Sequence, residues 1–118
     1  MAEDEPGLRK YVREVLERYG YTVLEARDGV EALDLAQKNS NRIELLLTDV
    51  VMPRMGGIEL TSRFRDLCPR VPVLHMSGYT YRAVRGAEAL DSYIQKPFTP
   101  SALLGRMRSL LNAVARQY

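Results

Sequence analysis

Ile43-Glu44-Leu45-Leu46-Leu47-Thr48-Asp49 is the stretch from which the fold can be worked out. An apolar run of this kind is typical of a strand that is covered on both faces, as in a parallel sheet packed between helices. A loop over residues 50–57 follows Asp49. Apolar residues then recur at helical spacing until Pro69, which predicts a helix and its end.

The rest of the chain alternates between helical and extended patterns. Upstream, the spacing predicts a helix over residues 8–19 and a strand over Tyr21–Ala26, after which Asp28 can cap a second helix. Downstream, the predicted elements are a strand over Val71–Ser77, a weak helix over Tyr79–Leu90, a short strand over Ser92–Lys96 and a helix from about Pro100. This alternation indicates an α/β fold with one parallel sheet, right-handed crossovers and helices on both faces.

The composition fits one domain and excludes several classes of protein. The chain has 118 residues, 46% hydrophobic and 27% charged, and residues 1–118 are predicted to form a single domain. Ordinary apolar content with near-balanced charge excludes disorder, and no apolar run approaches the roughly 20 residues of a membrane span. The single cysteine excludes an intrachain disulfide and suits a reducing cytosol. The net charge of +2 gives little support to a nucleic-acid surface.

Reactive side chains gather where the predicted strands end. Asp49, Ser77 and Lys96 each end a strand, and the acidic run Glu3-Asp4-Glu5 precedes the first helix. Ligands of an open parallel sheet bind beyond the carboxyl ends of its strands, so these groups are expected to meet at one edge. Two carboxylates about 5 Å apart repel by roughly 3 kcal/mol, and Mg²⁺ relieves that cost. A carboxylate beside Mg²⁺ and a lysine is arranged to accept a phosphoryl group.

Four motifs together resemble one family over the whole chain, the receiver domain of two-component response regulators. They are Glu3-Asp4-Glu5-Pro6, Leu47-Thr48-Asp49-Val50-Val51-Met52-Pro53-Arg54-Met55-Gly56-Gly57, Met76-Ser77-Gly78-Tyr79 and Tyr93-Ile94-Gln95-Lys96-Pro97-Phe98. The sequence of residues 76–80 further resembles that of receivers attached to hybrid sensor histidine kinases. The resemblance implies a flavodoxin-like doubly wound sheet of strand order 2-1-3-4-5 with five helices.

The resemblance implies a metal site around the phosphoacceptor. Asp49 is expected to accept the phosphoryl group and to share Mg²⁺ with Asp4, a direct ligand, and with the carbonyl of Val51. Glu3 is expected to act on the metal through water. It stands where the family more often has Asp, and its extra methylene can shift the water shell of the metal.

The resemblance also implies a switch. Ser77 is expected to be the switch hydroxyl, Lys96 to pair with the phosphoryl group, and Tyr93 to be the aromatic rotamer switch. The Lys96-Pro97 bond is expected to be cis. Phosphorylation is then expected to alter the face made by the fourth helix, fifth strand and fifth helix, which is also a candidate homodimer interface.

The implied partner is a histidine kinase or histidine phosphotransfer protein in the cytoplasm, which supplies the phosphoryl group from a phosphohistidine. No direct nucleic-acid or membrane contact is implied for this segment. Such a chain is a signalling domain rather than an enzyme, although it contributes catalytic groups to its own phosphorylation and dephosphorylation. Val51 and Tyr79 flank the position of the attacking water, and an apolar and a bulky residue there predict slow autodephosphorylation.

Three other functions fit the pattern less well. A phosphorylation-independent interaction module on the same fold would not need Asp4, Asp49, Ser77 and Lys96 together. A Mg²⁺-dependent phosphatase of the haloacid dehalogenase type requires a second Asp two residues after the first, where this chain has Val51. A nucleotide-binding domain requires a Gly-rich phosphate loop after a strand, and the sequence has no such loop after any predicted strand.

The start of the sequence departs from the family pattern. In the family, a first strand of about five buried apolar residues precedes the acidic pair, whereas only Met1 and Ala2 precede Glu3. Four buried apolar side chains contribute about 6–12 kcal/mol, which rivals the stability of a whole domain. We therefore expect an N-terminally truncated receiver with a gap inside its sheet. The absent residues exist outside this sequence, or another chain segment fills the gap.

Overall fold

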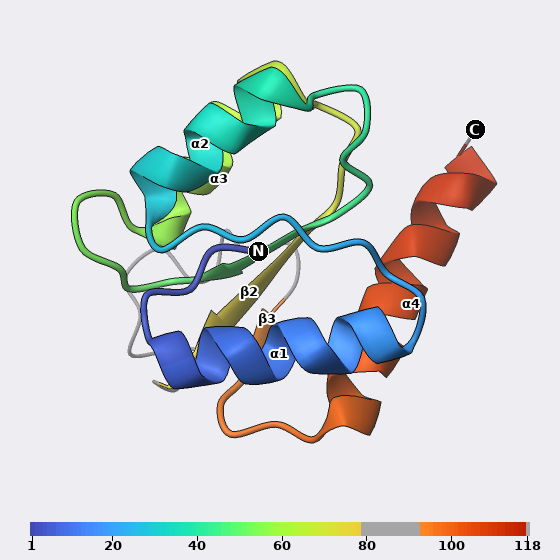
Figure 1. Ribbon diagram of the computed structural model, residues 1–118. Coiled ribbons are helices and arrows are strands. Elements are labelled where there is room, and N and C mark those ends of the chain that lie inside the picture. Colours follow the sequence, from blue (N-terminus) through green and yellow to red (C-terminus); the bar gives the residue numbers. More distant parts are fainter. Residues whose placement is uncertain (79–92, 118) are drawn as a thin grey trace.

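A computed structural model describes residues 1–78 and 93–117 (Figure 1). Its elements are α1 (Pro6–Arg18), α2 (Gly29–Lys38), β1 (Leu46–Asp49), α3 (Gly57–Leu67), β2 (Val73–Ser77), β3 (Tyr93–Gln95) and α4 (Pro100–Gln117). The helices and strands agree with the prediction except over Tyr21–Ala26, where no regular strand forms. The weak helix expected over Tyr79–Leu90 lies outside the described residues.

The sheet is parallel, and the order of its three described strands agrees with the prediction. β1 pairs with β2, and β2 pairs with β3. On the free side of β1, Ala2 forms isolated parallel bridges to Thr48 and to Ala26. Ala2 therefore lies between the segment that ends at Ala26 and β1, which is the place of the first strand in the order 2-1-3-4-5.

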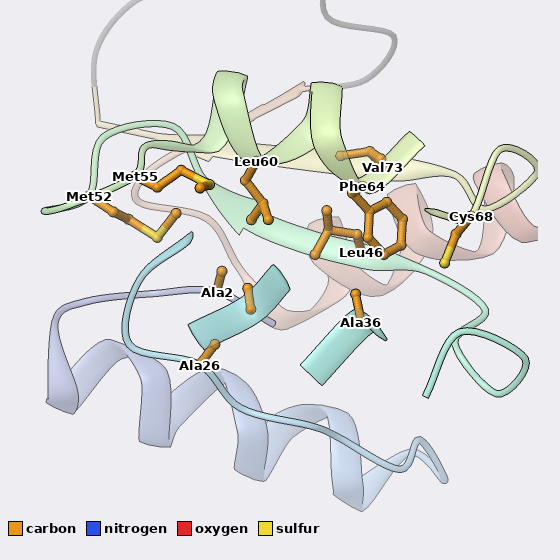
Figure 2. Packing of buried hydrophobic residues seen from close by; sticks show 11 residues of the cluster. Ala2, Ala26, Ala36, Leu46, Met52, Met55, Leu60, Phe64, Cys68 and Val73 are labelled. Atoms are coloured by element: carbon orange, nitrogen blue, oxygen red, sulfur yellow. The ribbon is translucent and has the colours of Figure 1, made fainter. Parts of the chain in front are cut away.

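Helices cover both faces of the sheet, with α2 and α3 on one side and α1 and α4 on the other (Figure 1). Successive β1 residues alternate between the two layers, as the pleat of a strand requires. Leu46 packs with Phe64 of α3, whereas Leu47 packs with Leu16 of α1 and Met107 of α4. Figure 2 shows the first layer, in which Ala2 lies near Ala26 and below Leu46. The apolar run of β1 is thus explained by burial on both faces.

Carboxylate side chains cap α1 and α2 at their N-termini. Glu5 accepts hydrogen bonds from the backbone N–H groups of Gly7 and Leu8, at 2.9 and 2.6 Å. Asp28 accepts one from the N–H of Glu31 at 2.9 Å, as predicted from its position. These carboxylates satisfy donors that have no partner inside the helix.

The segment Tyr21–Ala26 is not a regular strand, which corrects the prediction. Within the described residues only Ala26 bridges to a neighbour, namely Ala2. A strand is stabilised by a row of hydrogen bonds to a neighbouring strand. Here the neighbouring segment offers a single bridging residue, Ala2. The β-forming composition of residues 21–25 therefore has no ladder to join.

Two glycines allow close backbone packing, Gly57 against the end of β1 and Gly29 against Met55. The N–H of Gly57 donates to the carbonyl of Val50 at 2.8 Å. A side-chain carbon on Gly57 would collide with the carbonyl of Asp49 and the Cα of Val50. At the start of α2, a Cβ on Gly29 would lie 2.5 Å from the carbonyl oxygen of Met55. Both contacts are with backbone atoms, which cannot rotate away.

The substitution Gly57→Ala is expected to lower the free energy of unfolding by roughly 2 kcal/mol or more, because the backbone that carries Asp49 must shift. Chemical denaturation measures this change. Gly105→Ala is the matched control, since nothing lies within 4 Å of its added methyl group. That substitution, inside α4, is expected to be neutral or to stabilise by up to roughly 1 kcal/mol. Equal effects of the two substitutions would contradict the close approach.

Candidate functional site

The carboxyl ends of the strands bring four charged side chains together. Asp49 is the last residue of β1, and Lys96 directly follows β3. Glu3 and Asp4 directly follow Ala2, whose bridges place them at the same edge of the sheet. Residues from both ends of the sequence meet here because the carboxyl ends of parallel strands lie at the same edge of the sheet.

Lys96 is the centre of this group. Its Nζ donates to Glu3 Oε1 at 2.7 Å and forms an ion pair with Asp49 Oδ2 at 3.2 Å. The side chain of Lys96 is 20% exposed and that of Glu3 is fully buried, so water screens the pair little. The other oxygen of Asp49, Oδ1, accepts a hydrogen bond from the N–H of Val50 at 2.9 Å.

The acidic residues also form a candidate cation site. Glu3, Asp4 and Asp49 each offer a carboxylate oxygen, and these oxygens lie within 4.8 Å of one another. Glu3 Oε2 is buried and has no hydrogen-bond partner among the described residues. An unsatisfied buried oxygen beside two further carboxylates is a donor set that suits a hard cation such as Mg²⁺.

Burial and charge shift the proton affinities of the site. Burial and the nearby carboxylate of Asp49 raise the pKa of Glu3 to about 7, although Lys96 favours the ionised form. Burial lowers the pKa of Lys96, but the carboxylates of Glu3 and Asp49 outweigh it and hold that pKa above its ordinary value. The site therefore keeps its ammonium charged and has more negative charge nearby than one ammonium balances.

Of the remaining predicted site residues, Ser77 and Tyr93 lie on strands and Val51 lies in the loop after β1. Ser77 is buried at the end of β2, and its carbonyl accepts from the N–H of Lys96 at 2.7 Å. Tyr93 begins β3 half-buried, and its carbonyl accepts from Arg106 Nη1 at 3.1 Å. Val51 is 57% exposed, and Tyr79 lies outside the described residues. The peptide bond between Lys96 and Pro97 is cis, as expected.

One contact near the site was not found from the sequence. Arg54, with a positive φ of 64°, donates from Nε to Asp28 Oδ2 at 2.8 Å, and its Nη2 lies 2.7 Å from the same oxygen. This ion pair ties the loop after Asp49 to the start of α2. Nothing in a single sequence links positions 28 and 54, so only a helix cap could be predicted for Asp28.

A parallel α/β fold with an acidic pair, an aspartate and a lysine at the carboxyl edge defines a class of phosphoryl-accepting signalling domains. Comparison with known proteins identifies the family within that class. Residues 1–108 match the family model described as the response regulator receiver domain. The chain belongs to this family, whose members are the phosphoacceptors of two-component systems.

Curated relatives and solved structures agree with that assignment. The response regulator MprA of Mycobacterium sp. (strain KMS) is 38% identical over 114 residues, which cover 94% of this chain and 49% of the relative. The chain thus spans about half the length of the curated relatives it matches. The receiver domain of the hybrid histidine kinase CckA is 34% identical, with a TM-score of 0.81 over 93% of this chain and 94% of that one. The Vibrio cholerae chemotaxis protein CheY4 is 31% identical, with a TM-score of 0.83 over 92% and 93%.

Among the described residues, none of the helices combines the length and the apolar character that crossing a membrane requires.

The raised pKa of Glu3 predicts a pH dependence of stability in metal-free buffer. Between pH 4.5 and about 7 the folded state holds a proton on Glu3 that the unfolded chain has released, so the wild type loses stability as the pH rises. The loss is on the order of 3 kcal/mol. Glu3→Gln removes the titrating group, so its stability relative to wild type is expected to rise over this range in chemical denaturation.

Glu59→Gln is the control for that measurement, because Glu59 is an exposed glutamate of α3 paired with Arg63. It should leave the shape of the wild-type pH profile unchanged. Parallel profiles for wild type and Glu3→Gln would contradict the assigned proton.

Proposed function

We propose that Asp49 is the residue of this receiver domain that accepts the phosphoryl group, from a phosphohistidine on a partner protein. The observation that carries the proposal is the contact of Lys96 with both Glu3 and Asp49, at the sheet edge where Asp4 adds a third carboxylate. In the transfer, an oxygen of Asp49 forms the new bond to phosphorus as the bond from phosphorus to the donor nitrogen breaks.

A Mg²⁺ ion fits the same residues. Asp4 and Asp49 would bind it directly, the carbonyl of Val51 would be a third ligand, and Glu3 would act through water. When bound, Mg²⁺ supplies positive charge that neutralises the transferred oxygens. The buried, unpartnered oxygen of Glu3 supports this site, because a polar atom without a partner is costly to bury.

The protein's own groups then bind the product. Lys96 lies 3.2 Å from Asp49 Oδ2, so its ammonium can follow the added charge without leaving the edge of the sheet. Ser77, buried at the end of β2, is the proposed donor of a hydroxyl hydrogen bond to a phosphoryl oxygen. Tyr93 is the proposed rotamer switch, and its position at the start of β3 connects the site to α4 through Arg106.

The partner is a histidine kinase or a histidine phosphotransfer protein, and the compartment is the cytoplasm. The likeness to the receiver of a hybrid histidine kinase supports a place in a phosphorelay. The chain acts as a signalling domain that assists its own phosphorylation, with no nucleic-acid contact of its own. The face that includes β3 and α4 is the proposed surface for signal output and for a homodimer.

Two alternative functions differ from the proposed one in the chemistry they require. A phosphorylation-independent module would not respond to a phosphoryl analogue. A haloacid dehalogenase-type phosphatase would use an acid two residues after the nucleophile, where Val51 has no proton to give.

Beryllofluoride with Mg²⁺ is expected to form an adduct at Asp49 and to shift the NMR resonances of residues at the carboxyl edge of the sheet. Asp49→Asn is expected to abolish the adduct and also labelling by acetyl phosphate, because the nucleophilic oxygen is gone. Asp66→Asn, in α3, is the control and should leave both intact. Labelling that survives Asp49→Asn would contradict the proposed phosphoacceptor.

Phospho-Asp49 is expected to decay slowly, over many minutes, because the apolar side chain of Val51 gives no hydrogen bond to an attacking water. Decay of radiolabelled protein in Mg²⁺ buffer measures the half-life. Val51→Asn is expected to shorten it severalfold, since an amide can orient the water. The conservative Val51→Ile should not. A wild-type half-life of seconds would rule the hypothesis out.

A further inference from the structure

Three buried polar side chains lie behind the acidic site, between the sheet and α3. They are Thr48 of β1, Thr61 of α3 and His75 of β2. Thr48 and His75 are partners in the parallel register of β1 and β2, so their side chains leave the same face of the sheet. The phosphoryl chemistry proposed above uses none of the three. Because buried polar groups are costly unless they are hydrogen-bonded, their partners show what they hold in place.

The hydroxyl of Thr61 connects His75 to the first turn of α3. Thr61 Oγ1 lies 2.7 Å from the carbonyl oxygen of Gly57 and 2.8 Å from His75 Nε2. A hydroxyl has one hydrogen, and a carbonyl oxygen can only accept. The two oxygens attract each other only if that hydrogen lies between them, so Thr61 donates to Gly57. The hydrogen of the second contact then belongs to Nε2, and His75 donates to Thr61.

Gly57 in turn lies against the peptide between Asp49 and Val50. Its N–H donates to the carbonyl of Val50 at 2.8 Å, and no side-chain carbon would fit between Gly57 and the carbonyl of Asp49. Thr48 Oγ1 donates to that same carbonyl of Asp49 at 2.9 Å. The N–H of Val50 donates to Asp49 Oδ1 and to the carbonyl of Met76, both at 2.9 Å. The backbone that carries the Asp49 carboxylate is therefore held from several sides.

Directional hydrogen bonds distinguish this arrangement from simple core packing. Apolar side chains could fill the same volume, but they would not fix the direction of a carbonyl group. A threonine that donates to the carbonyl four residues earlier tends to bend its helix, and here that carbonyl is in the first residue of α3. The bond from His75 fixes the orientation of the Thr61 hydroxyl, and with it the position of the turn that contacts Asp49.

We propose that His75 is a positioning residue for phosphoryl transfer, acting through Thr61 and Gly57 on the peptide that orients the Asp49 carboxylate. This role rests on the proposed function of Asp49 as the phosphoacceptor. Attack on phosphorus requires the carboxylate in a defined orientation, with Oδ1 on the N–H of Val50 and Oδ2 beside Lys96. Loss of the Thr61 hydroxyl lets the first turn of α3 shift, so the transfer is expected to slow.

The first test compares two substitutions of Thr61. Thr61→Val keeps the shape of the side chain but removes the hydroxyl, and it is expected to slow labelling of Asp49 by acetyl phosphate with Mg²⁺ at least about fivefold. Thr61→Ser keeps the hydroxyl and should keep most of the rate. Ser62→Ala, at an exposed position of α3, is the control and should not change it. Rates are measured well below each variant's Tm, where a purely structural role would leave them unchanged.

The second test uses the imidazole itself. His75 is the only histidine of the sequence, so its ring resonances are unambiguous. Nitrogen NMR is expected to place a slowly exchanging hydrogen on Nε2. His75→Gln can present an amide N–H near the position of Nε2 and should keep most of the labelling rate. His75→Met has no donor and should lose about as much of the rate as Thr61→Val.

Several outcomes would overturn the positioning role. These are a normal labelling rate in Thr61→Val, equal losses in Thr61→Val and Thr61→Ser, or a His75 ring with its hydrogen on Nδ1 and Nε2 as the acceptor. If Thr61→Val does not fold, the comparison of His75→Gln with His75→Met decides. Wild-type protein that takes no label at Asp49 would overturn the proposed function as well, whereas normal labelling of Thr61→Val would overturn the positioning role alone.

Discussion

The ammonium of Lys96 between the carboxylates of Glu3 and Asp49 is the interaction on which the site depends. It joins residue 3 to residue 96, so the two ends of the sequence must both be in the sheet before the site exists. Parallel topology makes this contact, because each strand ends at the same edge. The low exposure of the pair strengthens the attraction and at the same time raises the cost of its surplus negative charge.

The same geometry couples stability to function. Ala2 packs in the layer of α2 and α3, and it is fully buried between Ala26 and β1. The acidic pair follows it directly, so whatever holds residues 1 and 2 in the ladder also holds the carboxylates. Gly57 plays a similar part at the end of β1, since its close approach fixes the backbone at Asp49.

Much of this arrangement could be predicted from the sequence, because it follows from local patterns and from the rule for strand ends. The apolar run before Asp49, the cap at Asp28 and the meeting of Asp49 with Lys96 are of this kind. The segment Tyr21–Ala26 could not be predicted in the same way, because its composition suits a strand but its pairing depends on a neighbour. The ion pair of Arg54 with Asp28 also depends on tertiary structure alone. It requires the backbone turn at Arg54, which no local sequence pattern predicts.

Lys96 Nζ lies closer to Glu3 Oε1 than to Asp49 Oδ2, at 2.7 against 3.2 Å. With every group ionised, three carboxylates and one ammonium leave the cluster with two surplus negative charges, which one divalent cation balances. If Asp49 accepts the phosphoryl group as proposed, its single negative charge is replaced by a phosphoryl group that carries nearly two. A cation held among these carboxylates would weaken the attraction of Glu3 for Lys96, while a phosphoryl group on Asp49 would strengthen the attraction of that position for Lys96. Under the proposed function, Glu3 is thus the partner of Lys96 before phosphorylation, and the balance of charge would favour release of Lys96 from Glu3 once Asp49 is phosphorylated.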